Sequence, residues 1–143
     1  MVVALEDLGL AIKRLQYRHH RTLDAKLGAL GITLVQWDAL RAISRHPNVS
    51  AHRLAQLTFQ TDQSFGALAG RLEARGLIDR VTGPGRAIRH HLTPAGEALL
   101  SEGLPVHHEV LAQSFSSLSP TERDTLYELL ARLLREPDGS LVE

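Results

Sequence analysis

The stretch RVTGPGRAIRHHLTPAG, residues 80–96, decides the fold of this chain. Two short extended segments, 77–81 and 86–92, flank a tight Thr-Gly-Pro-Gly turn, and a Thr93-Pro94 pair then opens a helix. A glycine-proline-glycine tip makes a narrow turn, so the arginines beside it can be presented to a phosphate backbone or a minor groove. We therefore expect a β-hairpin wing that is followed at once by a helix.

Helical patterns with clear caps surround this hairpin. Apolar residues spaced by three or four predict a long amphipathic helix over 5–27. Thr33, Ser50 and Thr61 are placed to cap the three helices that follow, and Ser119 is placed to cap the last one. The sequence thus predicts six helices and one hairpin.

The short helices over 51–58 and 62–75 are joined by a brief turn, which is the arrangement of a helix-turn-helix. In such a motif the second helix enters the major groove, and its N-terminal residues meet base edges. The predicted fold class is mainly α with a small β-hairpin wing: a winged helix-turn-helix with N- and C-terminal dimerisation helices.

Composition limits the classes of protein that fit. The 143 residues suit one domain, and no apolar run reaches the roughly 18 residues of a membrane span. The first residues lack the basic start and long apolar core of a signal peptide, so we expect a cytoplasmic protein with no membrane partner. The absence of cysteine excludes disulfides, thiolate metal sites and thiol redox switches.

Charge is divided unevenly although the net charge is zero. Residues 1–92 hold 13 Lys and Arg against 7 Asp and Glu, whereas residues 93–143 hold 3 against 9. The basic part is nearly all arginine, whose guanidinium forks onto phosphates and base edges. This distribution favours nucleic acid as a partner of the first part of the chain, and an unevenly charged, solvated surface is the alternative.

Two motifs resemble the MarR family of winged helix-turn-helix repressors: GRLEARGLIDR at 70–80 and RAIRHHLTPAGEALL at 86–100. The resemblance covers nearly the whole chain. It implies one MarR-like domain over 1–143, with a DNA-binding lobe at 33–96 and dimerisation helices at 1–30 and 97–143. Two departures stand out: Pro84 occupies the wing tip where the family usually has aspartate, and Ala67 replaces a residue that is basic or polar in many relatives.

The expected function is a transcriptional repressor that binds a pseudo-palindromic double-stranded DNA site as a homodimer. The leucine stripe of the last helix, around Leu126, Leu130 and Leu133, is too apolar to face water and supports that dimer. Glutamine and serine in the first turn of the 62–75 helix suit base edges, and the arginines suit phosphates or a minor groove. The predicted DNA-binding residues are Arg53, Gln63, Ser64, Arg71, Arg86 and Arg89.

A small aromatic or phenolic effector is implied by the same resemblance. Tyr17, His20 and Arg21 on the first helix and Trp37 on the second are candidates to line its cleft. For Trp37 the alternative is an ordinary core position, because a lone tryptophan at helical spacing usually packs inside.

Other functions have less support in the sequence. No nucleophile elbow, phosphate-binding loop, H-E-x-x-H or cysteine nucleophile is present, so we expect neither an enzyme, nor catalytic residues, nor a cofactor. The adjacent histidine pairs 19–20, 90–91 and 107–108 do not point the same way, which argues against a metal site. A metal-responsive regulator that uses histidines remains an alternative, as does a winged-helix protein-interaction module without DNA binding.

Overall fold

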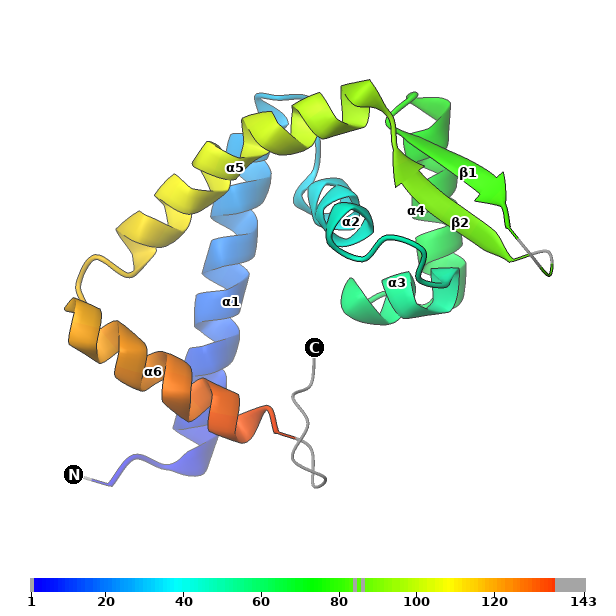
Figure 1. Ribbon diagram of the computed structural model, residues 1–143. Coiled ribbons are helices and arrows are strands. Elements are labelled where there is room, and N and C mark those ends of the chain that lie inside the picture. Colours follow the sequence, from blue (N-terminus) through cyan, green and yellow to red (C-terminus); the bar gives the residue numbers. More distant parts are fainter. Residues whose placement is uncertain (1, 84, 86, 136–143) are drawn as a thin grey trace.

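The computed structural model describes residues 2–83, 85 and 87–135. Over these residues the chain forms six helices and one antiparallel hairpin (Figure 1). In chain order the elements are α1 (Leu5–Gly28), α2 (Leu34–Arg45), α3 (Ala51–Leu57), α4 (Asp62–Ala74), β1 (Ile78–Thr82), β2 (Ile88–Leu92), α5 (Pro94–Ser114) and α6 (Pro120–Leu133). The predicted winged helix-turn-helix class is confirmed.

Local capping chemistry fixes where the helices begin. Each predicted cap accepts a hydrogen bond from the backbone N–H three residues later, which satisfies one of the free donors of a helix start. Reciprocal capping boxes form at the starts of α2 and α6, where Gln36 and Glu122 reach back to the N-cap backbone. The capping residues are Thr33, Ser50, Thr61, Thr93 and Ser119.

The hairpin has the register that its short turn imposes. Ile78 pairs with Leu92 at the open end, and Thr82 pairs with Ile88 next to the turn. At the entry to the hairpin, Gly76 adopts a left-handed φ of 72° and Leu77 N–H bonds back to the Leu72 carbonyl, which closes α4. The wing strand therefore leaves α4 without a linker.

The core sits in the lobe that α2, α3, α4 and the hairpin share, and the C-terminal part of α1 and part of α5 contribute to it. Its largest fully buried side chains are Leu27, Trp37, Leu40, Leu54, Phe65, Leu72 and Ile78. By contrast, none of the side chains of α6 is buried, and this helix stands with α1 and α5 in an open frame at the opposite end from the hairpin (Figure 1).

Polar contacts join the frame to the lobe. Asp24 on α1 accepts from the Leu34 N–H at 2.8 Å, at the first residue of α2. Arg75, directly after α4, donates to the Gly31 carbonyl at 2.8 Å and to Gln36 Oε1 at 3.2 Å.

Among the described residues no helix is both long and apolar enough to cross a membrane.

Candidate nucleic-acid interface and central cavity

The first turn of α4 exposes polar side chains on a rigid support. Thr61 Oγ1 accepts from the Ser64 N–H at 3.0 Å, and the side chains of Gln63 and Ser64 are exposed. The other face of the helix is buried through Phe65 and Leu72, as its spacing predicted. The result is a helix end with free donors and acceptors that cannot rotate without breaking the core.

A hydrogen bond holds the acidic residue at this helix start. His52 Nδ1 on α3 lies 2.8 Å from Asp62 Oδ1, and both side chains are exposed. The pair joins the first turns of the two helices of the helix-turn-helix. The hydrogen bond engages one carboxylate oxygen of Asp62, whose side chain is exposed at the start of α4.

The wing packs directly on α4. His90 of β2 is 5% exposed, and its ring meets Phe65 edge to face at 5.5 Å. Burial, together with the neighbouring Arg80 and His91, lowers the pKa of His90, and its Nδ1 has no hydrogen-bond partner among the described residues. Arg80 of β1 donates to Glu73 Oε1 at 3.1 Å, and this hydrogen bond lowers the pKa of Glu73.

The predicted DNA-binding residues lie on α3, α4 and the hairpin, which share one lobe (Figure 1). Gln63, Ser64 and Arg71 are exposed on α4, and Arg89 is half-buried on β2. Arg53 is half-buried on α3 and donates to Gln56 Oε1 at 3.3 Å. Arg86 lies outside the described residues.

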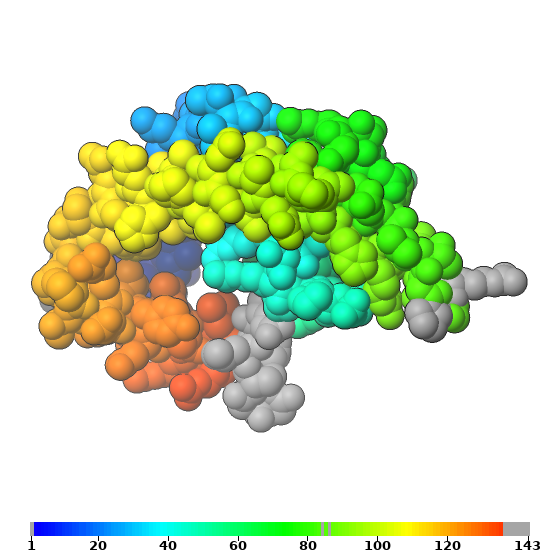
Figure 2. All heavy atoms as spheres, turned by 45° about the horizontal axis from the view of Figure 1, so that its top comes forward, coloured from blue at the N-terminus to red at the C-terminus, as the bar shows by residue number. Residues whose placement is uncertain are grey.

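A cavity of about 540 Å³, here named the central cavity, separates the frame from the lobe. Figure 2 shows the chain hollowed between α6, in orange, and α2, in cyan. The lining comes from α1, α2, the turn between α3 and α4, Phe115 and α6. The lining residues are Ile12, Leu15, Gln16, His19, His20, Leu23, Leu34, Val35, Asp38, Thr58, Phe59, Gln60, Phe115, Leu126 and Leu130.

Titratable groups occupy one part of this cavity. Burial raises the pKa of the Asp38 carboxyl, and the nearby Arg41 and His20 only partly oppose that shift. Burial, followed by Arg18, lowers the pKa of His19, whose Nε2 shares a hydrogen bond with Ser114 Oγ. The site therefore favours the neutral forms of both groups relative to water.

Trp37, which was predicted to line an effector cleft, does not line this cavity. Its side chain is fully buried, stacks on His107 with ring centroids 4.9 Å apart, and donates from Nε1 to the Leu100 carbonyl at 3.3 Å. The physical reason is that α5 crosses directly over the indole, at Gly103. The core interpretation of this tryptophan holds.

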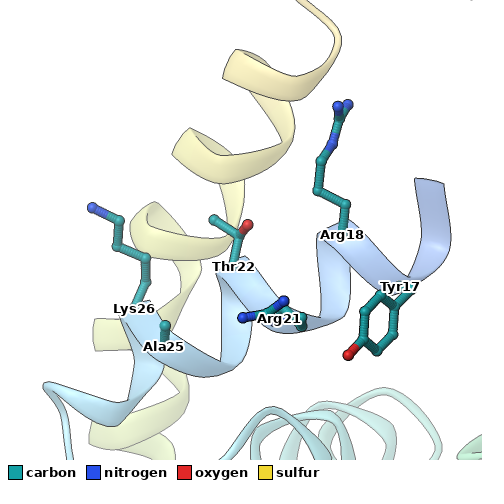
Figure 3. Close-up of a pocket in the computed structure, with 6 residues that line it drawn as sticks. All are labelled: Tyr17, Arg18, Arg21, Thr22, Ala25 and Lys26. Carbon is teal, nitrogen blue, oxygen red and sulfur yellow. The ribbon is translucent and has the colours of Figure 1, made fainter. Parts of the chain in front are cut away.

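The other predicted ligand-binding residues divide between two places. His20 lines the central cavity. Tyr17 and Arg21 instead line a shallow outer hollow whose described walls all come from α1, as Figure 3 shows. There the Arg21 guanidinium lies 5.8 Å from the centre of the Tyr17 ring. Among the described residues, no three His, Asp or Glu side chains are grouped so that they could hold a metal ion.

The chain is similar in sequence and in structure to known transcriptional regulators. The model of the MarR family matches residues 30–87. The transcriptional repressor MprA of Escherichia coli is 37% identical over 83 residues, which cover 53% of this chain and 47% of MprA, so the chain spans about half the length of that relative. A crystal structure of a probable transcriptional regulator from Pseudomonas aeruginosa is 33% identical with a TM-score of 0.79, covering 91% of this chain and 99% of that one.

The chain belongs to the MarR family. Another structure, that of the MarR family protein Rv2887 of Mycobacterium tuberculosis in complex with p-aminosalicylic acid, is 26% identical with a TM-score of 0.74. It covers 88% of this chain and 97% of Rv2887. MarR family members are transcriptional regulators and not enzymes, in agreement with the sequence-based expectation.

Three residues of this MarR family chain make contacts or line the cavity in ways that were not predicted from the sequence. They are His52, which pairs with Asp62, and Asp38 and Phe59, which line the central cavity. For Asp38 a signal existed, because it falls four residues after the buried Leu34 and so continues an apolar helical stripe with a carboxylate. Nothing in the local sequence marked Phe59 or His52.

Proposed function

We propose that this chain is a repressor that binds a pseudo-palindromic double-stranded DNA site as a homodimer and is released by a small aromatic effector. The observation that carries the proposal is the first turn of α4, which exposes Gln63 and Ser64 while its opposite face is locked in the core. Such a turn is the part of a helix-turn-helix that meets base edges. The name of MprA, a transcriptional repressor, supports the same function.

Each candidate residue has a distinct role in the proposal. Gln63 and Ser64 contact base edges in the major groove, where a glutamine amide suits adenine. Arg71 lies two turns further along α4 and contacts phosphate, as does Arg53 at the start of α3. Arg86 and Arg89 belong to the wing and contact phosphates or the minor groove.

Dimerisation involves the open frame. Apolar side chains on the first part of α1 and on α6 are exposed in the single chain, including Leu5 at 80% and Leu133 at 70%. Exposed apolar surface of this extent typically marks an interface between proteins. In this proposal residues 1–30 and 97–143 form the dimer, and residues 33–96 form the DNA-binding lobe.

Effector control uses the central cavity. Its walls include α1 and α6 of the frame as well as Thr58, Phe59 and Gln60, which form the turn of the helix-turn-helix. A ligand held there contacts both parts of the molecule and shifts their relative position, which changes the spacing of two recognition helices in a dimer. The complex of Rv2887 with an aromatic acid supports a small aromatic ligand in this family, with His20 as a contact here.

The test begins with selection of bound duplexes from random DNA, followed by anisotropy titrations with the full-length protein. We expect a two-fold symmetric site, and we expect Gln63→Ala to relax the preference at one base pair of each half-site. Lys26→Ala on the outer side of α1 is the matched control and should bind as the native protein does. Failure of any duplex to bind in a salt-dependent way would instead favour the protein-interaction module.

A further inference from the structure

The head group that the central cavity accepts can be inferred from its walls. Asp38 is the only formally charged side chain among its described lining residues, which include no lysine or arginine. The remaining polar groups are amides, hydroxyl and imidazoles, and the rest of the wall is aliphatic or phenyl. An aromatic carboxylate would therefore meet the Asp38 carboxyl group and, among the described lining residues, no guanidinium or ammonium group.

Asp38 has acceptor capacity that the fold does not use. It is half-buried on α2, and among the described residues it forms neither a hydrogen bond nor an ion pair within 4.0 Å. Arg41, one turn further along α2, lines an adjacent hollow to which Asp38 and Phe59 also contribute, and its guanidinium lies 5.8 Å from the centre of the Trp37 ring. A carboxylate that is partly removed from water binds a ligand donor more favourably than an exposed one.

Aromatic rings complete the site. Phe115 and Phe59 both line the cavity, and Phe59 lies at its edge, with 87% of its side chain exposed. Phe59 has a left-handed φ of 57°, a conformation that is rare for a bulky residue and found preferentially at functional sites. Phenyl faces attract cations, in particular those that are partly desolvated.

We infer that the central cavity selects an arylalkyl amine, with its ammonium group at Asp38 and its ring in the apolar part of the cavity, and discriminates against aromatic carboxylates. The volume of about 540 Å³ is ample for a ligand with one ring. The inference deepens the proposed effector control and rests on it for the consequence that the amine releases DNA. An alkylammonium ligand differs in charge from the Rv2887 ligand, p-aminosalicylic acid, which carries a carboxylic acid group and a ring amino group.

The experiment compares three probes that share a phenol ring and chain length: tyramine, the neutral alcohol tyrosol, and 4-hydroxyphenylacetate. Calorimetry with the full-length protein at fixed pH and salt should rank the amine first and the acid last. Asp38→Asn keeps the size of the side chain and removes its charge, so it should weaken the binding affinity for tyramine by at least about tenfold. The same variant should bind 4-hydroxyphenylacetate more tightly than the native protein does.

Two further variants make the result specific. Glu102→Gln removes one negative charge from an exposed position on α5 and should change no affinity. Phe59→Leu retains an apolar side chain but loses the ring face. It should therefore weaken the affinity for tyramine by roughly threefold or more and leave the affinity for tyrosol nearly unchanged. Circular dichroism and thermal unfolding establish that each variant is folded before its affinities are compared.

Several outcomes would overturn the inference: tighter binding of the acid than of the amine, an unchanged amine-to-acid ratio in Asp38→Asn, or no binding of any probe. Failure of the proposed function is distinguishable from these. A protein that binds tyramine through Asp38 yet binds no duplex would leave the ligand preference intact and reject the repressor. If both hold, saturating tyramine should lower DNA affinity, and DNA should lower tyramine affinity by the same factor.

Discussion

Gly103 is the position at which α5 crosses closest to the buried Trp37, and Gly103→Ala tests how tightly the frame and the lobe are packed. An alanine Cβ at this position would lie 2.1 Å from the indole Nε1 and 2.7 Å from Cδ1. Because Trp37 is fully buried and its ring is stacked on His107, the indole has no open space into which to move. The helix or the indole must therefore shift by more than an ångström.

The expected cost follows from three contributions. Overpacking in a close-packed core costs about 1–3 kcal/mol. Displacement of the indole breaks its 3.3 Å hydrogen bond to Leu100 and leaves a buried donor unpaired, at about 1–3 kcal/mol. The better helix propensity of alanine returns about 1 kcal/mol. We expect Gly103→Ala to lower the free energy of unfolding by about 3 kcal/mol and the midpoint temperature by roughly 10 °C.

The assay is chemical and thermal unfolding followed by far-UV circular dichroism, and also by tryptophan fluorescence in the variants that keep Trp37, the only tryptophan. Gly66→Ala is the matched control, since its added Cβ would meet nothing within 4 Å and should stabilise α4 by about 0.5–1 kcal/mol. Trp37→Phe removes the indole Nε1. In the double variant, the decrease in the free energy of unfolding should therefore be smaller than the sum of the two single-variant decreases, by more than about 1 kcal/mol. A Gly103→Ala protein as stable as the native one, measured at the same protein concentration, would refute the packing argument.

Three other predictions concern the wing, the DNA and the dimer. Because burial lowers the pKa of His90, the folded state binds fewer protons than the unfolded state, so the free energy of unfolding is highest above a pH of about 6.5 and decreases below it. In urea titrations between neutral and mildly acidic pH, His90→Leu should lose less of this free energy than the native protein does. An equal loss would contradict this cause. Arg86→Ala should make the slope of log affinity against log salt shallower by up to about 1.8 for two wings, whereas Gln63→Ala should leave that slope nearly unchanged; a native slope in Arg86→Ala would mean that the wing does not touch DNA. Deletion of residues 118–143 should give a monomer or an aggregate without DNA binding, and sedimentation of the intact chain as a well-folded monomer at micromolar concentration would oppose an obligate dimer.

The helices and the wing could be predicted from the sequence because their signals are local. A capping threonine or serine acts on a backbone N–H three residues away, so Thr33 and Ser119 specify helix starts without any distant partner. The Thr-Gly-Pro-Gly pattern at 82–85 is an equally local signal, and the strands on either side of it form the expected antiparallel pair.

The central cavity could not be predicted in the same way, since its walls meet only in three dimensions. The spacing of α2 identifies an apolar face but not which neighbour covers each side chain. Trp37 is covered by α5 at Gly103, more than sixty residues away, while Asp38 on the next position faces the cavity. The burial of His90 was hidden for a similar reason: alternation along β2 places it on one face, and only the packing of β2 on Phe65 shows that this face is dry.

The contact of Arg75 with the loop between α1 and α2 gives α4, the helix proposed to enter the major groove, the mechanics of a lever. Its fulcrum is the C-terminal end of α4, where the guanidinium bonds to Gly31 and Gln36. The working end is the first turn, which lies roughly 20 Å away for 13 residues at 1.5 Å each. A tilt of about 5° at the fulcrum moves Gln63 by roughly 1.7 Å, more than half the length of a hydrogen bond. Because α4 is locked in the core, the lobe must tilt with it as one body, and a tilt of this size is sufficient to take the first turn of α4 out of register with a base edge in the proposed DNA complex.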